Sequence, residues 1–142
     1  METTTATLKR KEDSVAADDE RLVIHAYSRA KAIADGVLIV VNDKLAREAG
    51  FMVPVALTQE VHDTYVRVPE GVICQDEAGR LWDILWMTRF AYQSDRLGEG
   101  IVAVHLSVRN DNRGASPVEL KACLGPGDRG ECVLTIMMPT ES

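Results

Sequence analysis

The stretch VELKACLGPGDRGECVLTIMMP, residues 118–139, decides the fold prediction because it holds two extended segments joined by a turn signal. Alternate residues from Val118 to Ala122 are apolar, and residues 133–138 form a second, mainly apolar run. Alternation with a period of two is typical of half-buried strands. Between the two runs, Gly125-Pro126-Gly127-Asp128 supplies the backbone freedom and the fixed φ that turns need. The stretch therefore predicts an antiparallel hairpin that turns at residues 125–128.

A further strand is predicted just before this hairpin. Apolar side chains at Val102, Val104, Leu106 and Val108 alternate with small or polar ones, and residues 110–114 (NDNRG) form a turn cluster. The C-terminal third is therefore predicted to be a three-stranded antiparallel meander.

Helix signals dominate the part of the chain before the meander. N-caps are expected at Ser28, at Asn42-Asp43 and at Thr58. The helical segments that follow them end near Gly36, Gly50 and Val66, in that order. The run at residues 81–90 (LWDILWMTRF) is apolar over more than half of its helical circumference, so it predicts the central helix.

Two segments of this first half are harder to assign. The apolar run at residues 37–41 is either a strand buried on both faces that leads into a helix or the end of a compact turn. Pro54 argues against a central strand at residues 51–57, because proline cannot donate a ladder hydrogen bond.

Together these patterns predict an α+β fold in which a helical N-terminal half packs on the C-terminal three-stranded antiparallel meander. Residues 1–21 have almost no periodic apolar pattern and are predicted to be a disordered tail, so residues 22–142 form a single α+β domain.

Composition limits the environment and the partners of the chain. Its 142 residues carry a net charge of −6, which opposes direct binding to nucleic-acid phosphates. The longest apolar run has five residues, far too few to span a membrane, and the N-terminus lacks the pattern of a signal peptide. With three cysteines and no C-x-x-C spacing, we expect a cytoplasmic protein without structural disulfides.

No catalytic, cofactor or metal motif is present in the sequence. His25, His62 and His105 do not have the spacing of metal ligands, although a cluster with Cys74 in space stays open. Cys123 and Cys132 lie two residues outside either end of the glycine-rich segment 125–130 and are expected to pack as small apolar thiols, with the alternative that they face each other across the hairpin. We therefore predict no catalytic residue, no metal and no cofactor.

The residues predicted to bind a partner are an aromatic anchor and the charges around it. Tryptophan is enriched at binding hot spots, and Trp86 is as well placed for a partner as for the core. The other candidates are the acids of an anionic surface and the residues of the hairpin turn, where backbone N–H groups could hold an anion: Glu60, Asp63, Asp76, Glu77, Asp128 and Arg129. A solvated mixed surface and a plain hairpin turn remain the simpler interpretations of these charges.

Four strings resemble an uncharacterised bacterial family, the domain-of-unknown-function family 6573. They are YSRAKAIADG (27–36), EAGFMVPVALT (48–58), DEAGRLWDILWM (76–87) and LKACLGPGDRGE (120–131), the last followed by TIMMP. The resemblance extends from Tyr27 to Pro139 and brings no activity with it. It implies a setting, because such families are often carried by plasmids, integrated elements and phages.

Three functions are consistent with these observations. The first is a mobile-element accessory protein that binds and inhibits a host defence complex, of anti-CRISPR or antirestriction type, through protein–protein contact. The second is a small enzyme that acts on a nucleotide or a protein with a His/Cys/Asp site. The third is a homo-oligomer, such as a homodimer, in which a strand edge pairs with its own copy.

Overall fold

The computed structural model describes residues 27–141, so the predicted tail at residues 1–21 and His25 lie outside the described residues. The chain divides into two units between Ala32 and Ile33. Helix α2 (Arg29–Ala34) begins after Ser28, whose Oγ accepts a hydrogen bond from the Lys31 amide at 3.0 Å. It ends at Gly36, which has a φ of +78°. The predicted cap and stop of this helix are confirmed.

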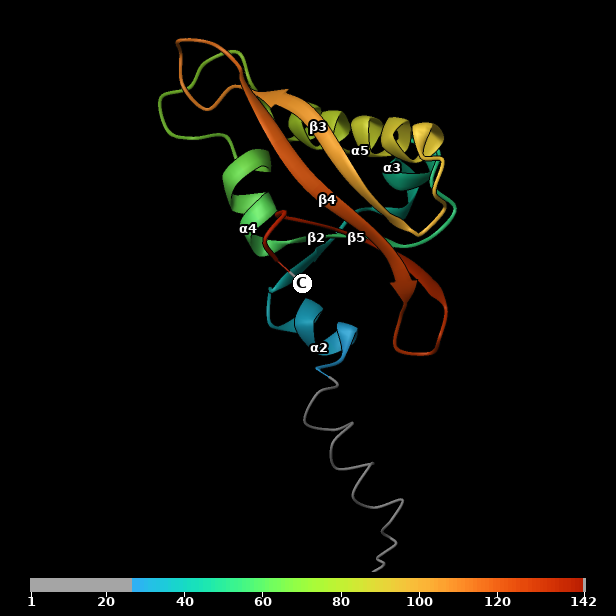
Figure 1. Ribbon diagram of the computed structural model, residues 1–142. Coiled ribbons are helices and arrows are strands. Elements are labelled where there is room, and N and C mark those ends of the chain that lie inside the picture. The colour runs from blue at the N-terminus through green and yellow to red at the C-terminus, as the bar shows by residue number, and fades with distance from the viewer. Residues whose placement is uncertain (1–26, 142) are drawn as a thin grey trace, which may run out of the picture. The chain divides into compact units, whose positions relative to one another are not determined.

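A five-stranded mixed sheet is the framework of residues 33–141, with the strand order β1-β2-β5-β4-β3 (Figure 1). The strands are β1 (Leu38–Val40), β2 (Val55–Thr58), β3 (Ile101–Val108), β4 (Ser116–Pro126) and β5 (Cys132–Met137). Neighbours are antiparallel except β2 and β5, which are parallel. The predicted fold class is therefore wrong: β3, β4 and β5 are antiparallel neighbours, but two strands from the N-terminal half extend the same sheet.

Strand β2 lies inside the sheet, where Pro54 was expected to exclude it. All four of its residues are buried. Pro54 immediately precedes the strand, and its carbonyl accepts a hydrogen bond from the Leu134 amide at 2.9 Å. Proline lacks only the N–H, so at this position it still joins the ladder as an acceptor.

Strand β1 forms one edge of the sheet and is not buried on both faces. Its residues are half-buried or exposed, and the side chain of Val40 is 50% exposed. The apolar run at residues 37–41 is therefore a short edge strand.

Short helices connect these strands. Helix α3 (Asp43–Glu48) is capped by Asn42, whose Oδ1 accepts from the Lys44 and Leu45 amides. The predicted helix from Thr58 to Val66 is present as α4 (Gln59–Val61) followed by a π-helical segment, η1 (His62–Val66). The long helix α5 (Glu77–Ser94) starts earlier than the run at residues 81–90 suggested, because Asp76 caps it through a 2.6 Å hydrogen bond from the Gly79 amide.

The core lies between α5 and one face of the sheet (Figure 1). Ile84, Leu85 and Thr88 of α5 are fully buried, and Ile84 and Leu85 pack in one cluster with alternate residues of the strands, including Val104, Leu120, Leu134 and Ile136. Among the described residues, none of the helices is both long enough and apolar enough to cross a membrane.

The β4–β5 turn lies two residues beyond its predicted position. Strand β4 continues through Gly125 and Pro126, which oppose Val133 and Cys132. The hairpin closes where the Gly127 amide donates to the Glu131 carbonyl, and Gly130 adopts a φ of +80°. The ladder alternates, so the missing N–H of Pro126 falls at a position that makes no bond to β5. Cys123 opposes Thr135, so the alternative in which it faces Cys132 is wrong.

Candidate functional site

Strand β3 is the second edge of the sheet and has one side without a partner strand among the described residues. The Leu124 amide donates to the Gly100 carbonyl at 2.8 Å, and Ile101 opposes Cys123. Because antiparallel pairs alternate, the even-numbered residues of β3 bond to β4, whereas the N–H and C=O groups of the odd-numbered ones point away from it. These outward groups belong to Ile101, Ala103, His105 and Ser107.

Helix α5 runs beside this edge and supplies a second wall. The cavities next to β3 are lined by helix residues that are alternately three and four positions apart: Arg80, Asp83, Met87, Phe90 and Ser94. Such spacing places side chains on one flank of a helix. Three cavities follow one another along β3, and neighbouring ones share lining residues such as Asp83 and Met87. We call this continuous feature the α5–β3 groove.

One end of the groove is polar and is built around Arg80. This cavity, of about 280 Å³, is lined by Tyr65, Gln75, Arg80, Asp83, Leu106, Ser107, Val108, Arg109 and Ala115. Arg80 is 5% exposed, and burial lowers the pKa of its guanidinium because desolvation disfavours the charged form.

Among the described residues, the oxygens that accept hydrogen bonds from the Arg80 guanidinium are all neutral. Nε donates to the Tyr65 carbonyl at 2.9 Å, and Nη1 donates to the Arg109 carbonyl at 2.7 Å and, more weakly, to Gln75 Oε1 at 3.4 Å. Nη2 donates to Asn110 Oδ1 at 2.5 Å. Within residues 27–141 no carboxylate forms an ion pair with Arg80. The groove therefore ends at a buried cation without a counter-charge.

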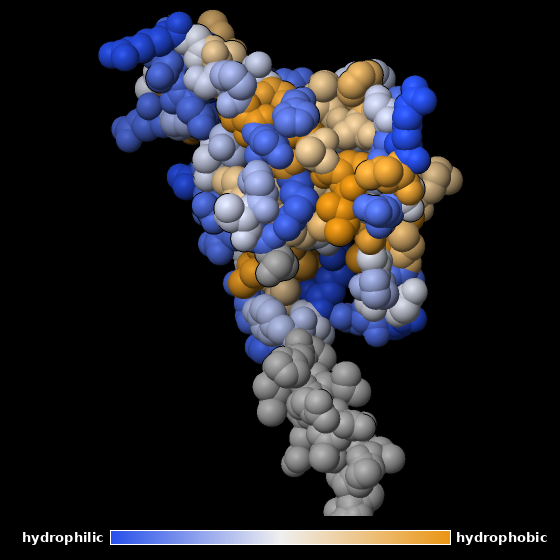
Figure 2. All heavy atoms as spheres, viewed as in Figure 1, coloured by the Kyte–Doolittle hydropathy of each residue, from blue (hydrophilic) through white to orange (hydrophobic). Residues whose placement is uncertain are grey.

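The other end of the groove is apolar. Phe90 and Ile101 are each 57% exposed and Leu97 is 78% exposed, and all three line the same cavity with Met87. Figure 2 shows apolar side chains exposed among polar ones over the region where β3 lies beside α5. Exposed large apolar side chains that cluster in this way mark surfaces used for binding.

Trp86 stands at the middle of the groove, where it lines the cavity that joins the two ends. Its side chain is 47% exposed and stacks on the partly buried Trp82, with the ring centroids 5.9 Å apart. The guanidinium carbon of Arg89 lies 5.3 Å from the Trp86 ring centroid, which is a cation–π contact. The exposed indole is therefore held in a fixed orientation.

The family comparison covers nearly the whole of this fold. Residues 15–142 match a family of unknown function, DUF6573. The chain belongs to the DUF6573 family. No curated protein and no solved structure matches it. Membership in DUF6573, a family of unknown function, confirms the resemblance found in the sequence.

Of the predicted partner-binding residues in this DUF6573 chain, the structure places only Trp86 in the groove. Asp76 is the N-cap of α5, and Glu77 occupies its first turn. Asp128 and Arg129 lie in the β4–β5 turn, where the Arg129 amide donates to Glu131 Oε1. These residues do not line the groove, so they form separate parts of the surface.

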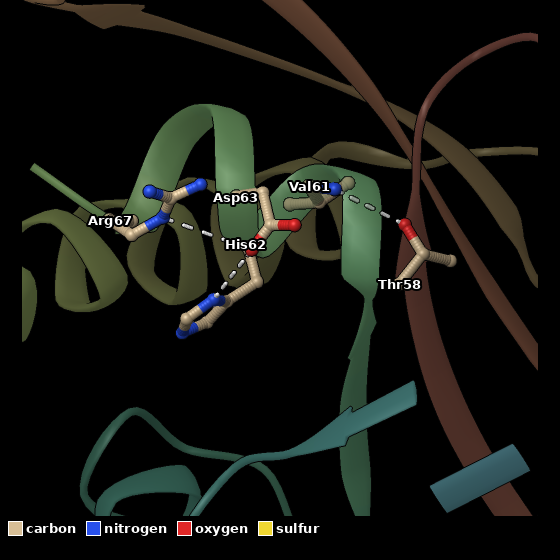
Figure 3. A network of polar contacts seen from close by, with 5 residues as sticks. All are labelled: Thr58, Val61, His62, Asp63 and Arg67. Carbon is tan, nitrogen blue, oxygen red and sulfur yellow. Dashed lines mark hydrogen bonds and ion pairs between the residues drawn. The ribbon is translucent and has the colours of Figure 1, made fainter. Parts of the chain in front are cut away.

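Glu60 and Asp63 lie on α4 and η1, beside a small polar network (Figure 3). Asp63 Oδ1 is 3.6 Å from His62 Nδ1 and 4.0 Å from Arg67 Nε, and both side chains of the Asp63–Arg67 pair are substantially exposed. Exposed ion pairs contribute about 0–1 kcal/mol. Thr58 Oγ1 accepts from the Val61 amide nearby, which is the predicted cap.

The described residues do not form a metal cluster from His, Cys, Asp and Glu. Within residues 27–141, His62 is on η1, His105 is on the exposed face of β3, and Cys74 is exposed in the loop before α5. These three residues therefore lie on different elements.

Arg80 is the groove residue that the sequence did not reveal. It lies four residues before Ile84 and eight before Thr88, so it continues the buried stripe of α5. This spacing in the sequence could have indicated that Arg80 lies on the buried face of α5. Arginine at such a position is normally assigned to the surface, because charged residues are rarely fully buried unless paired.

Proposed function

We propose that this chain is a non-enzymatic protein-binding module that captures an extended segment of a partner protein along the α5–β3 groove. The observation that carries the proposal is the outward edge of β3, four residues with unpaired backbone groups beside a lined groove. An extended segment that adds a strand there would gain backbone hydrogen bonds from β3 and side-chain contacts from α5.

The chemistry of the groove favours a different protein over a second copy of the chain. One end holds the buried cation of Arg80 and the other holds the apolar Phe90, Leu97 and Ile101. A two-fold pairing of β3 with its own copy would set the apolar end of one chain against the polar end of the other. A partner segment with an acidic residue near one end and apolar residues near the other matches both ends.

We further propose that the partner is a component of a host defence complex and that binding inhibits it. The support is the mobile-element setting that the family resemblance implies, together with the net charge of −6, which suits a partner with a basic nucleic-acid channel. Trp86 then acts as the aromatic anchor at the centre of the interface.

Proline substitution at the edge tests strand addition. In His105→Pro the outward N–H is lost and a bulky ring faces the incoming strand, while the bonds from β3 to β4 are kept. Captured proteins are compared between wild type and variant, and we expect the affinity for the true partner to fall at least about tenfold, or about 1.4 kcal/mol. His105→Ala, which keeps the N–H, separates the contribution of the imidazole.

Val40→Pro is the matched control. The Gln59 amide donates to the Val37 carbonyl, so alternation places the Val40 N–H on the outer side of β1, the opposite edge of the sheet. This variant is expected to retain the partner. Equal loss of binding in both proline variants, with both folded by circular dichroism, would contradict the proposal.

Two further measurements separate the alternatives. Amide exchange by NMR should show partner-dependent protection at Ala103, His105 and Ser107, and no change at Val102 and Val104. Light scattering tests self-pairing: a dimer that His105→Pro dissociates would make a second copy the occupant. For the inhibitory role, cells that carry a restriction or CRISPR nuclease are challenged with a target plasmid, whose survival should rise with wild type and not with His105→Pro.

A further inference from the structure

The buried cation at the polar end of the groove has a consequence for what the groove binds. Removing a charge from water is costly unless the charge is paired, and Arg80 has only neutral acceptors among the described residues. Four of its five N–H groups are used. One Nη2 hydrogen has no acceptor within residues 27–141, and the 3.4 Å contact of Nη1 with Gln75 is the weakest of the four.

We infer that the Arg80 cavity is a carboxylate pocket that receives an acidic side chain or a C-terminal carboxylate of the captured segment, an inference that rests on the proposed function. The cavity of about 280 Å³ is large enough for such a group. A carboxylate matches the planar geometry of a guanidinium, and its hydrogen bonds to arginine are stronger than those of neutral acceptors. The hydroxyl of Ser107 lines the same wall and can donate a further hydrogen bond.

Three segments build the pocket, which explains why Arg80 is buried there. Tyr65 belongs to η1, Gln75 to the loop before α5, and Arg109 and Asn110 follow β3. Side chains of the β3–β4 turn hold the other two segments in place: Asn110 Nδ2 donates to the Thr64 carbonyl of η1 at 2.9 Å, and Asn112 Nδ2 donates to the Gly71 carbonyl of the loop at 2.8 Å. The Arg109 guanidinium donates to the Ile73 carbonyl. The pocket is therefore preformed.

Asp83 also lines the pocket and sets its selectivity. It is exposed and is shared with the neighbouring cavity that holds Trp86. A phosphate carries more negative charge than a single carboxylate, so the charge of Asp83 opposes the entry of a phosphate more strongly. The chain's net charge of −6 acts in the same direction.

The test uses three small probes and the full chain. N-acetylglycine carries a C-terminal carboxylate, N-acetyl-aspartic acid amide carries a side-chain carboxylate, and N-acetyl-asparagine amide is the neutral isostere. Each is titrated into the millimolar range, where fragments of this size bind, while the Nε–Hε resonance of Arg80 is followed by NMR. The two acids should shift this resonance saturably, and the tighter of the two identifies the source of the carboxylate. An equal shift with the asparagine probe, or no shift with either acid, would overturn the inference.

Three charge variants that leave Arg80 in place locate the binding. Gln75→Glu puts a built-in carboxylate beside Nη1, so it should raise the melting temperature and weaken the acid probes several-fold. Gln59→Glu adds the same charge at the start of α4, outside the residues that line the pocket, and should not weaken them. Asp83→Asn should tighten them a few-fold. Unchanged probe binding in Gln75→Glu would show that the probes bind elsewhere, and the pocket would be rejected.

The outcome is separable from that of strand addition, because single-residue probes do not need the β3 edge. The probes should bind His105→Pro as they bind wild type. Failure of the probes therefore removes the carboxylate pocket alone, whereas intact partner binding in His105→Pro removes the proposed function.

Discussion

At the scale of single residues, Arg80 and Tyr92 show how buried polar groups join segments that are distant in the sequence. Arg80 links the end of η1 to the residues that follow β3. Tyr92 links the C-terminal part of α5 to the start of β3, because its hydroxyl donates to the Gly100 carbonyl at 2.7 Å. Arg80 supplies the side-chain donor for the Tyr65 and Arg109 carbonyls, whereas Tyr92 adds a second donor to the Gly100 carbonyl, which also accepts from the Leu124 amide.

Replacement of Arg80 by methionine tests the structural part of this role. Arg80→Met keeps much of the side-chain volume but leaves the carbonyls of Tyr65 and Arg109 without their donor. We expect a loss of about 2–4 kcal/mol in the free energy of unfolding. Arg96→Met, at an exposed position, is the control and should change it by less than about 0.5 kcal/mol in chemical denaturation. Similar values for both variants would contradict the linking role.

Tyr92 makes stability depend on alkaline pH. Burial is the largest cause that raises the pKa of Tyr92, followed by the negative charges of Cys123, Asp95 and Cys132 when ionised. A pKa raised in the folded state stabilises the protonated form, so this contribution is complete below about pH 10, the unfolded value, and is lost as the pH rises further.

The comparison that isolates this effect is wild type against Tyr92→Phe. The variant should lose about 1 kcal/mol near neutral pH, since it lacks the hydrogen bond to Gly100. Its free energy of unfolding should then fall less steeply than that of wild type above about pH 10. Parallel stability curves for the two proteins over that range would show that Tyr92 keeps its ordinary pKa.

At the scale of elements, the β4–β5 hairpin shows which feature of a glycine-rich turn sets the register. Four residues of the chain in this region signal a turn at 125–128, yet the strand continues through Pro126. The turn forms where the Gly127 amide can bond to the Glu131 carbonyl and Gly130 can adopt a positive φ. A three-residue loop that ends in a left-handed residue is a common hairpin connection.

Two alanine substitutions distinguish these glycines. A Cβ at either Gly130 or Gly125 would meet nothing within 4 Å, so the backbone alone decides the cost. Gly130 has a φ of +80°, and Gly130→Ala should destabilise the protein by about 1–2 kcal/mol. Gly125→Ala should be close to neutral or slightly stabilising. Thermal unfolding measures both, and the reverse ranking would place the turn at Gly125.

At the scale of the whole molecule, one layer of core joins α5 to strands from both halves of the chain. Ile84 is fully buried in a cluster that also contains residues of β2 and β5, two strands that are far apart in the sequence. This arrangement predicts that residues 33–141 unfold together. It also explains why β3 can remain an edge strand. The apolar side chains of the sheet are buried against α5, so their burial does not need another strand beyond β3.

Truncation of the core tests this cooperativity. Ile84→Ala should lower the free energy of unfolding by about 2–5 kcal/mol, through lost burial and the cavity it leaves. Tryptophan fluorescence and far-ultraviolet circular dichroism should report the same midpoint, as two-state unfolding requires. Ile73→Ala, at a position that is 63% exposed, should change stability by about 0.5 kcal/mol or less. Separate midpoints for the two signals would contradict a single cooperative core.

The sequence alone determined the local elements, because their signals are local. The caps at Ser28, Asn42 and Thr58 lie within three residues of the amides they bind, and the alternation of β3 repeats every two residues. It also singled out Trp86, which is 47% exposed, as a residue as well placed for a partner as for the core, and it placed the chain in its family. These features depend on residue spacing, which can be read without the fold.

Only the tertiary structure decided the sheet order and the candidate site. The parallel pairing of Val55 with Leu134 joins segments from opposite ends of the chain, and no local pattern specifies it. The α5–β3 groove depends on α5 lying beside β3 and on β3 having one side without a partner strand in the described part of the chain, which are properties of the assembled sheet. Arg80 became a site residue because Tyr65, Arg109 and Asn110 meet around it. Long-range contacts create such sites, so they follow from the packing of elements whose identities the sequence largely specifies.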